Sequence, residues 1–277
     1  MSNLHNAVSR YWFVEASDLE TRLSQDYHES TKVSEFLFGF GSKDPKRTPA
    51  MMNTVNAVAG KSKSYSYFPR VDLDPLAWED LDIPLGELIK KRRTNRNYID
   101  KPLTHAELST LLVRGAGLNG TIGVGANQTR DGRTYPSGGG LYPLEVYSIV
   151  LNVEGVSEGV YHFDVRNHCL NRLLQKDDLR GTVKRAYMSE KMLEKTAVCF
   201  LVTAIFKRTS FKYGERAYRL VNIEAGHLIH NMLFVGQALG LSIIPINGFF
   251  DRRLEQLINV DGVEESILYT AIGGCID

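Results

Sequence analysis

Several features that would point to a particular class of protein are scarce or absent in this sequence. It has three cysteines in 277 residues, Cys169, Cys199 and Cys275. Their odd number and wide spacing exclude a disulfide framework and a zinc knuckle. Positive and negative side chains nearly balance, with 33 Lys and Arg against 32 Asp and Glu, so the chain has no overall basic field for non-specific nucleic-acid binding. We therefore expect reduced cysteines, no metal site and no nucleic-acid partner.

Long hydrophobic runs are missing as well. The longest apolar stretch, residues 197–206, has about half of the roughly 20 residues that a membrane-spanning helix needs, so we expect it to form a buried strand. The N-terminus carries no basic segment followed by an apolar core and a small-residue cleavage site, which is the pattern of a secretory signal. The sequence therefore predicts a cytoplasmic protein with no membrane partner.

The composition that is present is typical of a folded protein. With 43% hydrophobic and 23% charged residues, disorder, collagen and coiled coil are excluded for the chain as a whole. Residues 1–80 are irregular, with polar interruptions and prolines, and predict an N-terminal arm or a small helical subdomain. Clear patterns begin near Pro84, so residues 81–277 are predicted to form the main domain.

Local signals predict mixed helices and strands in the main domain. Thr104 followed by Glu107 matches a capping box and predicts a helix over 106–113. The apolar segment 217–239 stops at Gly240 and predicts a long central helix that is largely enclosed. Further helices are expected at 84–93 and 252–258, and strands at 145–153, 160–164, 196–206, 242–246 and 266–272. Because helices and strands do not alternate regularly, we expect an α+β fold.

A glycine pattern at residues 115–120 matches Gly-x-Gly-x-x-Gly, the fingerprint of dinucleotide-binding sites. That site needs a strand before the glycines and a helix after them. Here a predicted helix precedes the pattern, and further glycines follow it as far as Gly125. We therefore interpret the segment as a loop that follows a helix.

A basic cluster occupies residues 90–96 and contains Arg92, Arg93, Thr94 and Arg96. One interpretation is a solvated helix end, where the helix dipole favours positive charge. The other is an anion site, because guanidinium groups and a hydroxyl suit a phosphate. Composition alone favours the first.

A glycine-rich segment, residues 136–143, lies between Tyr135 and the strand that is expected from residue 145. Its three consecutive glycines expose backbone N–H groups and allow a planar or phosphorylated ligand to approach closely. A plain loop before a strand explains the pattern equally well.

Two pairs of residues near the long helix have side chains that are able to act chemically. Lys212 and Tyr213 are adjacent, and such a pair serves as a general acid and base when burial lowers the pKa of the lysine; the alternative is two surface residues. His227 and His230 are three residues apart, but no Asp, Glu or Cys partner is evident. We interpret them as core or interface histidines.

Together, residues 92–98, 136–143, 211–213 and 245–249 resemble one family in their order and spacing. They resemble the FMN-dependent nitroreductase superfamily, and within it the SagB-type azoline dehydrogenases of microcin-like peptide clusters. Residues 26–32 also resemble that branch. The resemblance implies a nitroreductase-like α+β fold, with a central mixed or antiparallel sheet flanked by helices, in an intertwined homodimer with FMN at the subunit interface. The small residues Ala225, Gly226 and Gly236 of the long helix suit such close packing.

The resemblance also assigns roles to individual residues. The glutamate that is common in the family at the position of Asn247 is absent here, so no side-chain role is transferred to that residue. The implied flavin-binding residues are Arg92, Arg93, Thr94 and Arg96 at the phosphate and ring edge, Ser137, Gly138 and Gly139 along the flavin, and Asn247 and Gly248 near flavin N5. Lys212 and Tyr213 match the catalytic pair, either of which is the base.

The function implied by this resemblance is FMN-dependent oxidation of thiazoline or oxazoline rings to thiazole or oxazole in a ribosomally made peptide. Tyr135, Tyr142 and the N-terminal arm are expected to shape the peptide channel, and a cyclodehydratase is the expected partner. Two alternatives stay open: an NAD(P)H-dependent reductase of the nitroreductase kind, and a non-catalytic scaffold subunit with a flavin-binding fold.

Overall fold

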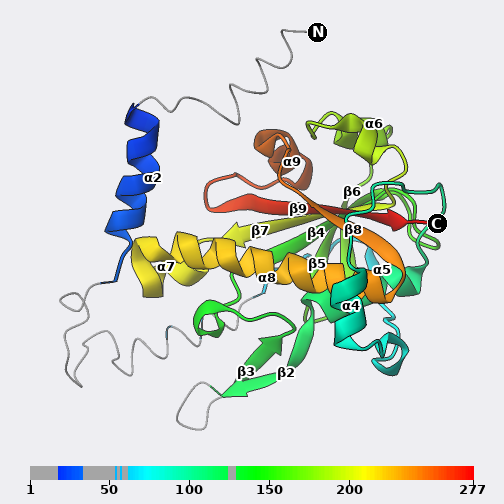
Figure 1. The fold of residues 1–277 in the computed structure, drawn as a ribbon, viewed down its shortest axis with the longest axis horizontal. Helices are drawn as coiled ribbons and strands as arrows, with labels where there is room; N and C mark the ends of the chain where they lie inside the picture. Colours follow the sequence, from blue (N-terminus) through cyan, green and yellow to red (C-terminus); the bar gives the residue numbers. More distant parts are fainter. Residues whose placement is uncertain (1–17, 34–53, 55–56, 58–61, 124–128) are drawn as a thin grey trace. The chain divides into compact units, whose positions relative to one another are not determined.

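The computed structural model describes residues 18–33, 54, 57, 62–123 and 129–277 (Figure 1). The chain divides into two units, residues 1–51 and 52–277. In the first unit the structure describes helix α2 (Asp18–Ser30), after which the Thr31 hydroxyl donates a hydrogen bond to the Tyr27 carbonyl at 2.7 Å. Of the arm that the sequence predicts over residues 1–80, residues 1–17, 34–53, 55–56 and 58–61 lie outside the described residues.

The second unit is built on a seven-stranded sheet in the order β1-β6-β5-β4-β7-β9-β8, and every neighbouring pair is antiparallel. The strands are β1 (Arg70–Asp72), β4 (Leu144–Val150), β5 (Gly159–Asp164), β6 (Cys169–Leu174), β7 (Val198–Ile205), β8 (Leu241–Ile246) and β9 (Glu265–Cys275). The helices are α4 (Leu85–Lys91), α5 (His105–Ala116), α6 (Leu179–Lys184), α7 (Lys207–Tyr213), α8 (Ala217–Ala238) and α9 (Asp251–Ile258). The short 3-10 turns are η2 (Glu79–Leu81), η3 (Gly138–Gly140), η4 (Glu190–Leu193) and η5 (Gly214–Arg216). The predicted α+β architecture with a central antiparallel sheet is confirmed.

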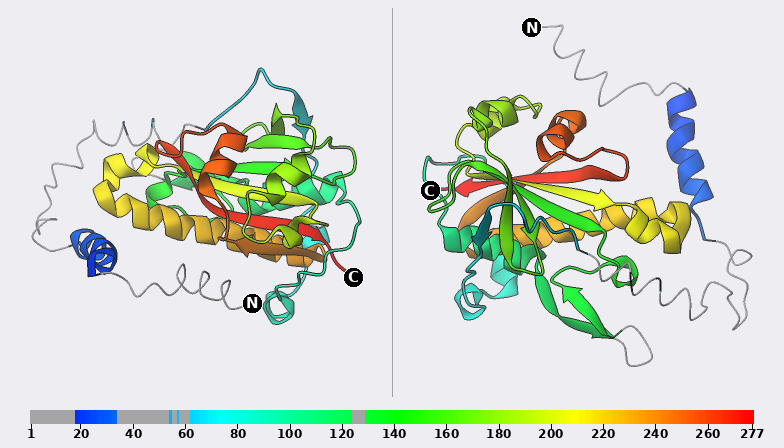
Figure 2. Two further views of the ribbon diagram at one scale, coloured as in Figure 1. Left: turned by 90° about the horizontal axis from the view of Figure 1, so that it is seen from above. Right: turned by 180° about the vertical axis from the view of Figure 1, so that it is seen from behind.

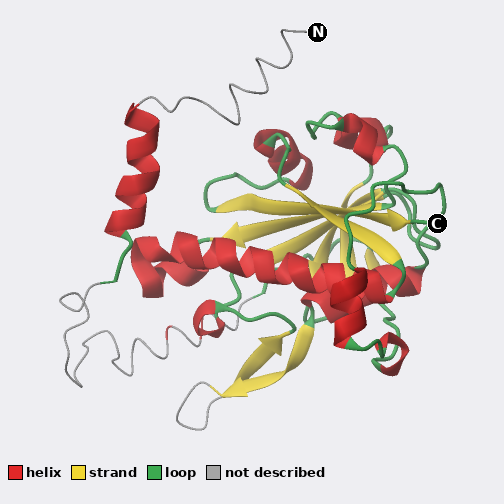
Figure 3. Ribbon diagram, viewed as in Figure 1, coloured by secondary structure: helices red, strands yellow, loops and turns green. Residues whose placement is uncertain are grey.

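Helices cover both faces of this sheet (Figure 3). On one face α5 and α8 bury an apolar cluster that includes Phe200 and Val202 of β7. On the other face α6 and α9 enclose a second cluster, which includes Cys199 and Leu201. Successive side chains of a strand point to opposite faces, so a strand covered on both sides is apolar throughout. This explains why residues 197–206 form a continuous hydrophobic run. Figure 2 shows α8 lying along one side of the sheet.

The strongest local signals of the sequence are confirmed. The Thr104 side chain accepts a hydrogen bond from the Glu107 N–H, and the Glu107 carboxylate accepts one from the Thr104 N–H, so the capping box begins α5 as predicted. Helix α8 ends just before Gly240, which has a left-handed φ of 72°. The strands predicted over 145–153 and 160–164 correspond to β4 and β5, which are antiparallel neighbours.

The glycine pattern at residues 115–120 has a different structure from the predicted loop. Gly115 lies in the last turn of α5, and β2 (Leu118–Gly123) follows it and pairs with β3 (Thr129–Arg133). The loop prediction is wrong because the partner strand, and not the local sequence, makes this segment extended. No helix follows the glycines up to Gly123, so a dinucleotide-binding turn is absent from this described segment.

Strand β1 lies N-terminal to residue 80, where the sequence predicts the domain boundary. It is the edge strand of the sheet, and Val71 pairs with Leu170 of β6. Earlier in the chain, the Lys63 Nζ atom lies 2.6 Å from Glu265 Oε2 at the start of β9. Residues 62–80 therefore contact the sheet directly, and the boundary at residue 80 stays a prediction.

Helix α8 is less enclosed than the sequence predicts. Ala225 and Gly236 do face the core, and a Cβ atom at Gly236 would collide with Ile243. Gly226 has no atom within 4 Å of its Cβ position, and Ile223 is 57% exposed. The prediction of an enclosed helix is thus wrong for this face, because the described residues leave Ile223 exposed.

Among the described helices, none combines the length and the apolar character needed to cross a bilayer.

Candidate active site

Three segments that the sequence singles out leave the sheet at the same end. Strand β4 begins at Leu144, which pairs with Ala204 near the end of β7. At the end of β8, Ile246 pairs with Thr270, which in turn pairs with Leu201 of β7. The turn η3 before β4, helix α7 after β7 and the loop after β8 therefore start from one end of the sheet.

The glycine turn η3 is in direct contact with the predicted catalytic pair. Gly139 has a left-handed φ of 68°, and a Cβ atom there would lie 2.6 Å from Lys212 Nζ and 2.6 Å from Tyr213 Oη. Both functional groups thus lie against the Gly139 backbone, whose left-handed φ favours glycine. The structure brings together two motifs that are far apart in the sequence.

Helix α7 presents this pair at its last turn. It ends at Tyr213 and is followed by Gly214, whose φ is 55°. The Lys212 ammonium lies 5.1 Å from the centre of the Tyr213 ring. Both side chains are half-buried. The arrangement places an amine and a phenol, each able to donate or accept a proton, side by side at the turn.

Ser137 connects η3 to helix α8. Its hydroxyl donates a hydrogen bond to Glu224 Oε2 at 2.7 Å and accepts one from the Tyr142 N–H at 2.9 Å. Glu224 is 3% exposed, and this burial raises the pKa of its carboxyl to about 7, although hydrogen bonds from Ser137 and the Gly138 N–H act in the opposite direction. Glu224 is not among the site residues predicted from the sequence. An acidic residue inside the apolar run of α8 is the signal that would have found it.

The other side of η3 is covered by the hairpin of β2 and β3. Arg130 Nη1 donates a hydrogen bond to the Gly140 carbonyl at 3.2 Å, while Arg130 Nε is buried and has no partner in the part of the chain that the structure describes. The Arg133 guanidinium lies 5.5 Å from the centre of the Tyr142 ring. The turn therefore has positive charge on its hairpin side, from two arginines to which the sequence assigned no individual role.

The arginine loop, residues 92–97, lies at the other end of β8. The carbonyl of Asn95 accepts a hydrogen bond from Ser242, at the start of that strand, at 2.7 Å. Asn247 follows the end of the same strand, roughly 17 Å away at about 3.4 Å per residue. Within one chain, the arginine loop therefore lies at the opposite end of the sheet from η3, α7 and the loop after β8.

The side chains of the arginine loop are accessible. Arg93, Thr94 and Arg96 are exposed and Arg92 is half-buried. Arg93 Nη1 donates hydrogen bonds to the carbonyls of Lys90 and Arg92. Within the part of the chain that the structure describes, no carboxylate forms an ion pair with these three arginines. Their charges are available to an anion.

The loop after β8 is held from one side. The Gly248 carbonyl accepts a hydrogen bond from the Met188 N–H at 2.9 Å, and a Cβ atom at Gly248 would lie 3.4 Å from Met188 Sδ. Asn247 is exposed. The loop after β8 is therefore anchored through Gly248 and exposes Asn247 at the same end of the sheet as η3.

A buried charged network connects helix α7 to the sheet. Glu145 of β4 accepts a hydrogen bond from Arg208 of α7 at 2.6 Å and lies 2.9 Å from His162 Nε2. Burial by itself would raise the pKa of Glu145, but the His162 hydrogen bond and the charges of His162 and Arg208 lower it to about 2. The network also includes Lys63, whose backbone N–H donates to Glu145 Oε1 at 3.2 Å. It fixes the helix that carries the Lys212 and Tyr213 side chains.

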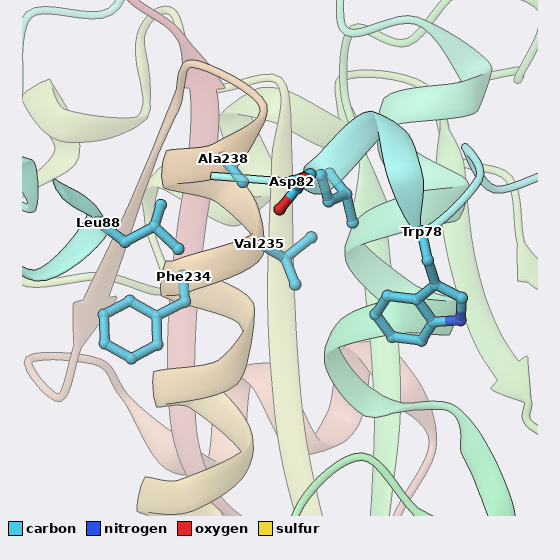
Figure 4. A pocket seen from close by; sticks show the side chains of 7 residues that line it. Trp78, Asp82, Leu88, Phe234, Val235 and Ala238 are labelled. Carbon is cyan, nitrogen blue, oxygen red and sulfur yellow. The ribbon is translucent and has the colours of Figure 1, made fainter. Parts of the chain in front are cut away.

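One apolar pocket lies apart from these groups (Figure 4). It has a volume of about 440 Å³ and is open between the C-terminal half of α8 and the segment around Trp78. Its lining is apolar except for Asp82. Phe234 in this pocket is ten residues from Glu224 along α8, roughly 15 Å at 1.5 Å per residue, so the pocket is separate from the glycine turn.

The two histidines of α8 are both exposed. The ring of His230 packs against that of Phe234, with centroids 4.4 Å apart. The interpretation of His227 and His230 as core residues is therefore wrong for a single chain, and a position at an interface stays a prediction. No group of three His, Cys, Asp or Glu side chains in the described ranges is arranged to hold a metal ion.

Comparison with known sequences gives consistent results. The model of the Nitroreductase family matches residues 89–274. A nitroreductase candidate of Methanocaldococcus jannaschii, MJ1384, is 30% identical over 71% of this chain and 93% of its own length. The trifolitoxin-processing protein TfxB of Rhizobium leguminosarum is 27% identical over 58% of the chain, and the microcin B17-processing protein McbC of Escherichia coli is 29% identical over 47%. The chain spans 44% and 49% of the lengths of these two processing proteins.

Solved structures share the fold. A nitroreductase candidate of Anabaena variabilis has a TM-score of 0.66 and 25% identity, covering 91% of this chain and 46% of that chain. A chain of the E. coli microcin synthetase McbBCD complex, which has truncated pro-MccB17 bound, has a TM-score of 0.56 and 22% identity, covering 94% of this chain and 95% of that chain. The nitroreductase-like fold that the resemblance implied is confirmed, and the intertwined homodimer stays a prediction.

Proposed function

Because the chain belongs to the nitroreductase family, we propose that it is an FMN-dependent azoline dehydrogenase, which oxidises thiazoline or oxazoline rings of a peptide to thiazole or oxazole. The observation that carries this proposal is the contact of Lys212 and Tyr213 with the backbone of Gly139. This contact supports the proposal, because the resemblance assigns the glycine turn to the flavin and the pair to proton transfer. The similarity to two peptide-processing proteins supports the same reaction class.

The residues present fit FMN. A dianionic phosphate needs cations, and the accessible arginines Arg92, Arg93 and Arg96 supply them, with the Thr94 hydroxyl beside them. The turn at Gly139 offers bare backbone, which a planar ring can approach closely. The ring would lie along Ser137, Gly138 and Gly139, near Asn247 and Gly248. When bound, FMN supplies the acceptor for a hydride.

The proposed reaction removes two hydrogen atoms from each azoline ring. The Cα hydrogen leaves as a proton, and its C–H electron pair forms the new ring double bond. The hydrogen of the adjacent ring carbon leaves as a hydride with its electron pair. Either Lys212 Nζ or Tyr213 Oη takes the proton. Both are held against the Gly139 backbone, so the base is positioned before the substrate arrives.

We also propose that two copies of the chain complete the site. In one chain the arginine loop and the glycine turn lie at opposite ends of the sheet, and α8 leaves Ile223 exposed beside the open position of Gly226. Leu85 and Ile89 of α4 are 63% and 57% exposed as well, and a second copy would cover such apolar residues. Light scattering of the purified protein tests this, and a monomeric mass contradicts it.

The proposed substrate is a ribosomally made peptide that already carries azoline rings, so the proposed partner is the cyclodehydratase that makes them. Support comes from the microcin synthetase complex, in which a chain of this fold is found with a bound precursor peptide. Co-purification of this chain with such an enzyme, followed by ring oxidation, tests the partnership.

The decisive experiment compares variants of α7 in the FMN-loaded protein. Lys212→Ala together with Tyr213→Phe is expected to keep the flavin spectrum and abolish ring oxidation, which is measured as the loss of two hydrogen masses per ring by mass spectrometry. Each single variant then shows which group is the base. Lys207→Ala is the matched control, because Lys207 lies at the other end of α7 and pairs with Glu264 on the surface. Undiminished oxidation by the double variant refutes the assignment.

A second candidate function is an NAD(P)H-dependent nitroreductase, which is favoured by the similarity to MJ1384. Stopped-flow mixing with NADPH separates the two functions: rapid bleaching of the flavin supports the reductase, and no response supports the dehydrogenase. A protein that stays colourless after incubation with FMN contradicts both and supports a scaffold role.

A further inference from the structure

We infer that Glu224 is a positioning residue of the flavin site, whose carboxyl holds the Ser137–Gly139 turn in place and takes up a proton when flavin binds over that turn. This inference rests on the proposed binding of FMN. The inference goes beyond the proposed binding, because flavin affinity then depends on a buried carboxyl of helix α8 that lies under the turn.

The geometry makes Glu224 the support of the turn. Its Oε2 atom accepts the Ser137 hydroxyl hydrogen at 2.7 Å, and the Gly138 N–H is a second donor to the carboxyl. The Ser137 oxygen in turn accepts the Tyr142 N–H at 2.9 Å. Gly139, the next residue of the turn, contacts Lys212 and Tyr213. A change at Glu224 is therefore passed to the residues against which the catalytic pair lies.

The second carboxyl oxygen is the unusual feature. Glu224 is 3% exposed, and its Oε1 atom is buried with no hydrogen-bond partner among the described residues. A buried carboxylate oxygen without a donor is costly, and protonation removes that cost. A structural glutamate of the same chain looks different: Glu255 of α9 is also 3% exposed, but its Oε1 accepts the Ser266 hydroxyl at 2.7 Å and its Oε2 contacts Arg252.

Few charged groups of the described residues face Glu224. Arg133 at the end of β3 favours the ionised form of Glu224. The buried Tyr135 hydroxyl also has no hydrogen-bond partner within the described ranges, and the Glu224 charge helps to raise its pKa. Lys212 and Tyr213 reach the same turn from α7, and α5 adds apolar side chains to the adjoining core. Burial and these groups together leave the pKa of Glu224 at about 7. Its carboxyl therefore gains or loses a proton when the pH changes around neutrality.

The direction of the coupling follows from desolvation. A planar ring over the turn removes the remaining water and favours the neutral carboxyl, which raises the pKa of Glu224 further. Binding then takes up a proton, so affinity falls as the pH rises through 7. If binding raises the pKa by one unit, the dissociation constant increases up to about tenfold between about pH 6 and pH 9.

The experiment measures the dissociation constants of riboflavin and of FMN by flavin fluorescence across this pH range. Riboflavin has no phosphate to titrate, so its pH profile reports on the protein alone. The wild type is expected to lose affinity for both as the pH rises. Glu224→Gln, which keeps the acceptor oxygen but cannot ionise, is expected to bind riboflavin with a flat profile. Glu255→Gln is the control and should keep the wild-type profile.

A second readout needs no flavin. In the protein without ligand, the NMR amide signals of Gly138 and Gly139 are expected to shift with a midpoint near pH 7 in the wild type and not in Glu224→Gln. If the wild type binds flavin with a flat profile, or if the glutamine variant keeps the pH dependence, the inference is wrong while the proposed function stands. If the wild type binds neither flavin, both the inference and the proposed function fall.

Discussion

Glu145 is the carboxylate that connects helix α7 to the sheet, and Glu145→Gln is expected to lower the free energy of unfolding by about 3 kcal/mol at neutral pH. Two independent quantities lead to this value of the free energy. Removing one partner of a buried ion pair costs roughly 3–5 kcal/mol, and here Arg208 would stay buried beside an uncharged amide. The lowering of the Glu145 pKa from 4.5 to about 2 corresponds to about 3 kcal/mol at 1.36 kcal/mol per unit.

The pH dependence of this stability loss is a sharper test of the role of the Glu145 charge than the size of the loss at neutral pH. Because the pKa of Glu145 is lower in the folded protein than in the unfolded chain, its contribution to stability is complete well above pH 4.5 and is lost as the pH falls towards 2. The glutamine variant has no such group to protonate. The difference in stability between wild type and variant should therefore shrink by about 2 kcal/mol between about pH 7 and about pH 3.

The assay is urea unfolding followed by circular dichroism at the two pH values. Glu264→Gln is the control, because Glu264 pairs with Lys207 at the surface, where both side chains are more than half exposed, and such pairs contribute about 0–1 kcal/mol. A stability difference that is the same at both pH values would show that Glu145 acts through packing and not through its charge. The variant should also lose ring-oxidation activity, since Arg208 no longer fixes α7.

Two further variants test the site. Gly139→Ala is expected to abolish ring oxidation and to lower the free energy of unfolding by roughly 1–2 kcal/mol, because its backbone is left-handed. Gly120→Ala is the control for strain alone and should keep activity, since Gly120 has a φ of 67° and no described atom within 4 Å of its Cβ position. Equal loss of activity in both variants contradicts a specific role for the contact of Gly139 with Lys212 and Tyr213. Arg93→Ala with Arg96→Ala is expected to weaken FMN binding at least tenfold and riboflavin binding little in fluorescence titrations, because the guanidinium groups meet the phosphate. Equal weakening of both ligands would show that these arginines contact the ring.

Much of the architecture is encoded in short segments of the sequence. The capping box of Thr104 and Glu107, the end of α8 at Gly240 and the apolar run of β7 each depend on residues within a few positions of one another. The glycine turn and the adjacent Lys212 and Tyr213 are also visible as local patterns. Such features are predictable because the relevant contacts, or the periodic burial, arise within a single element.

The tertiary structure decided which of these patterns belong together. Strand β2 is extended because β3 pairs with it, and Gly139 meets Lys212 because β4 and β7 are antiparallel neighbours in a fixed register. Glu224 became significant only when α8 placed it beneath Ser137. These relations join residues distant in sequence, and their strength comes from burial and strand pairing that no local window contains. The sequence by itself determined the elements and the chemical groups, while long-range packing determined their neighbours and therefore the candidate site.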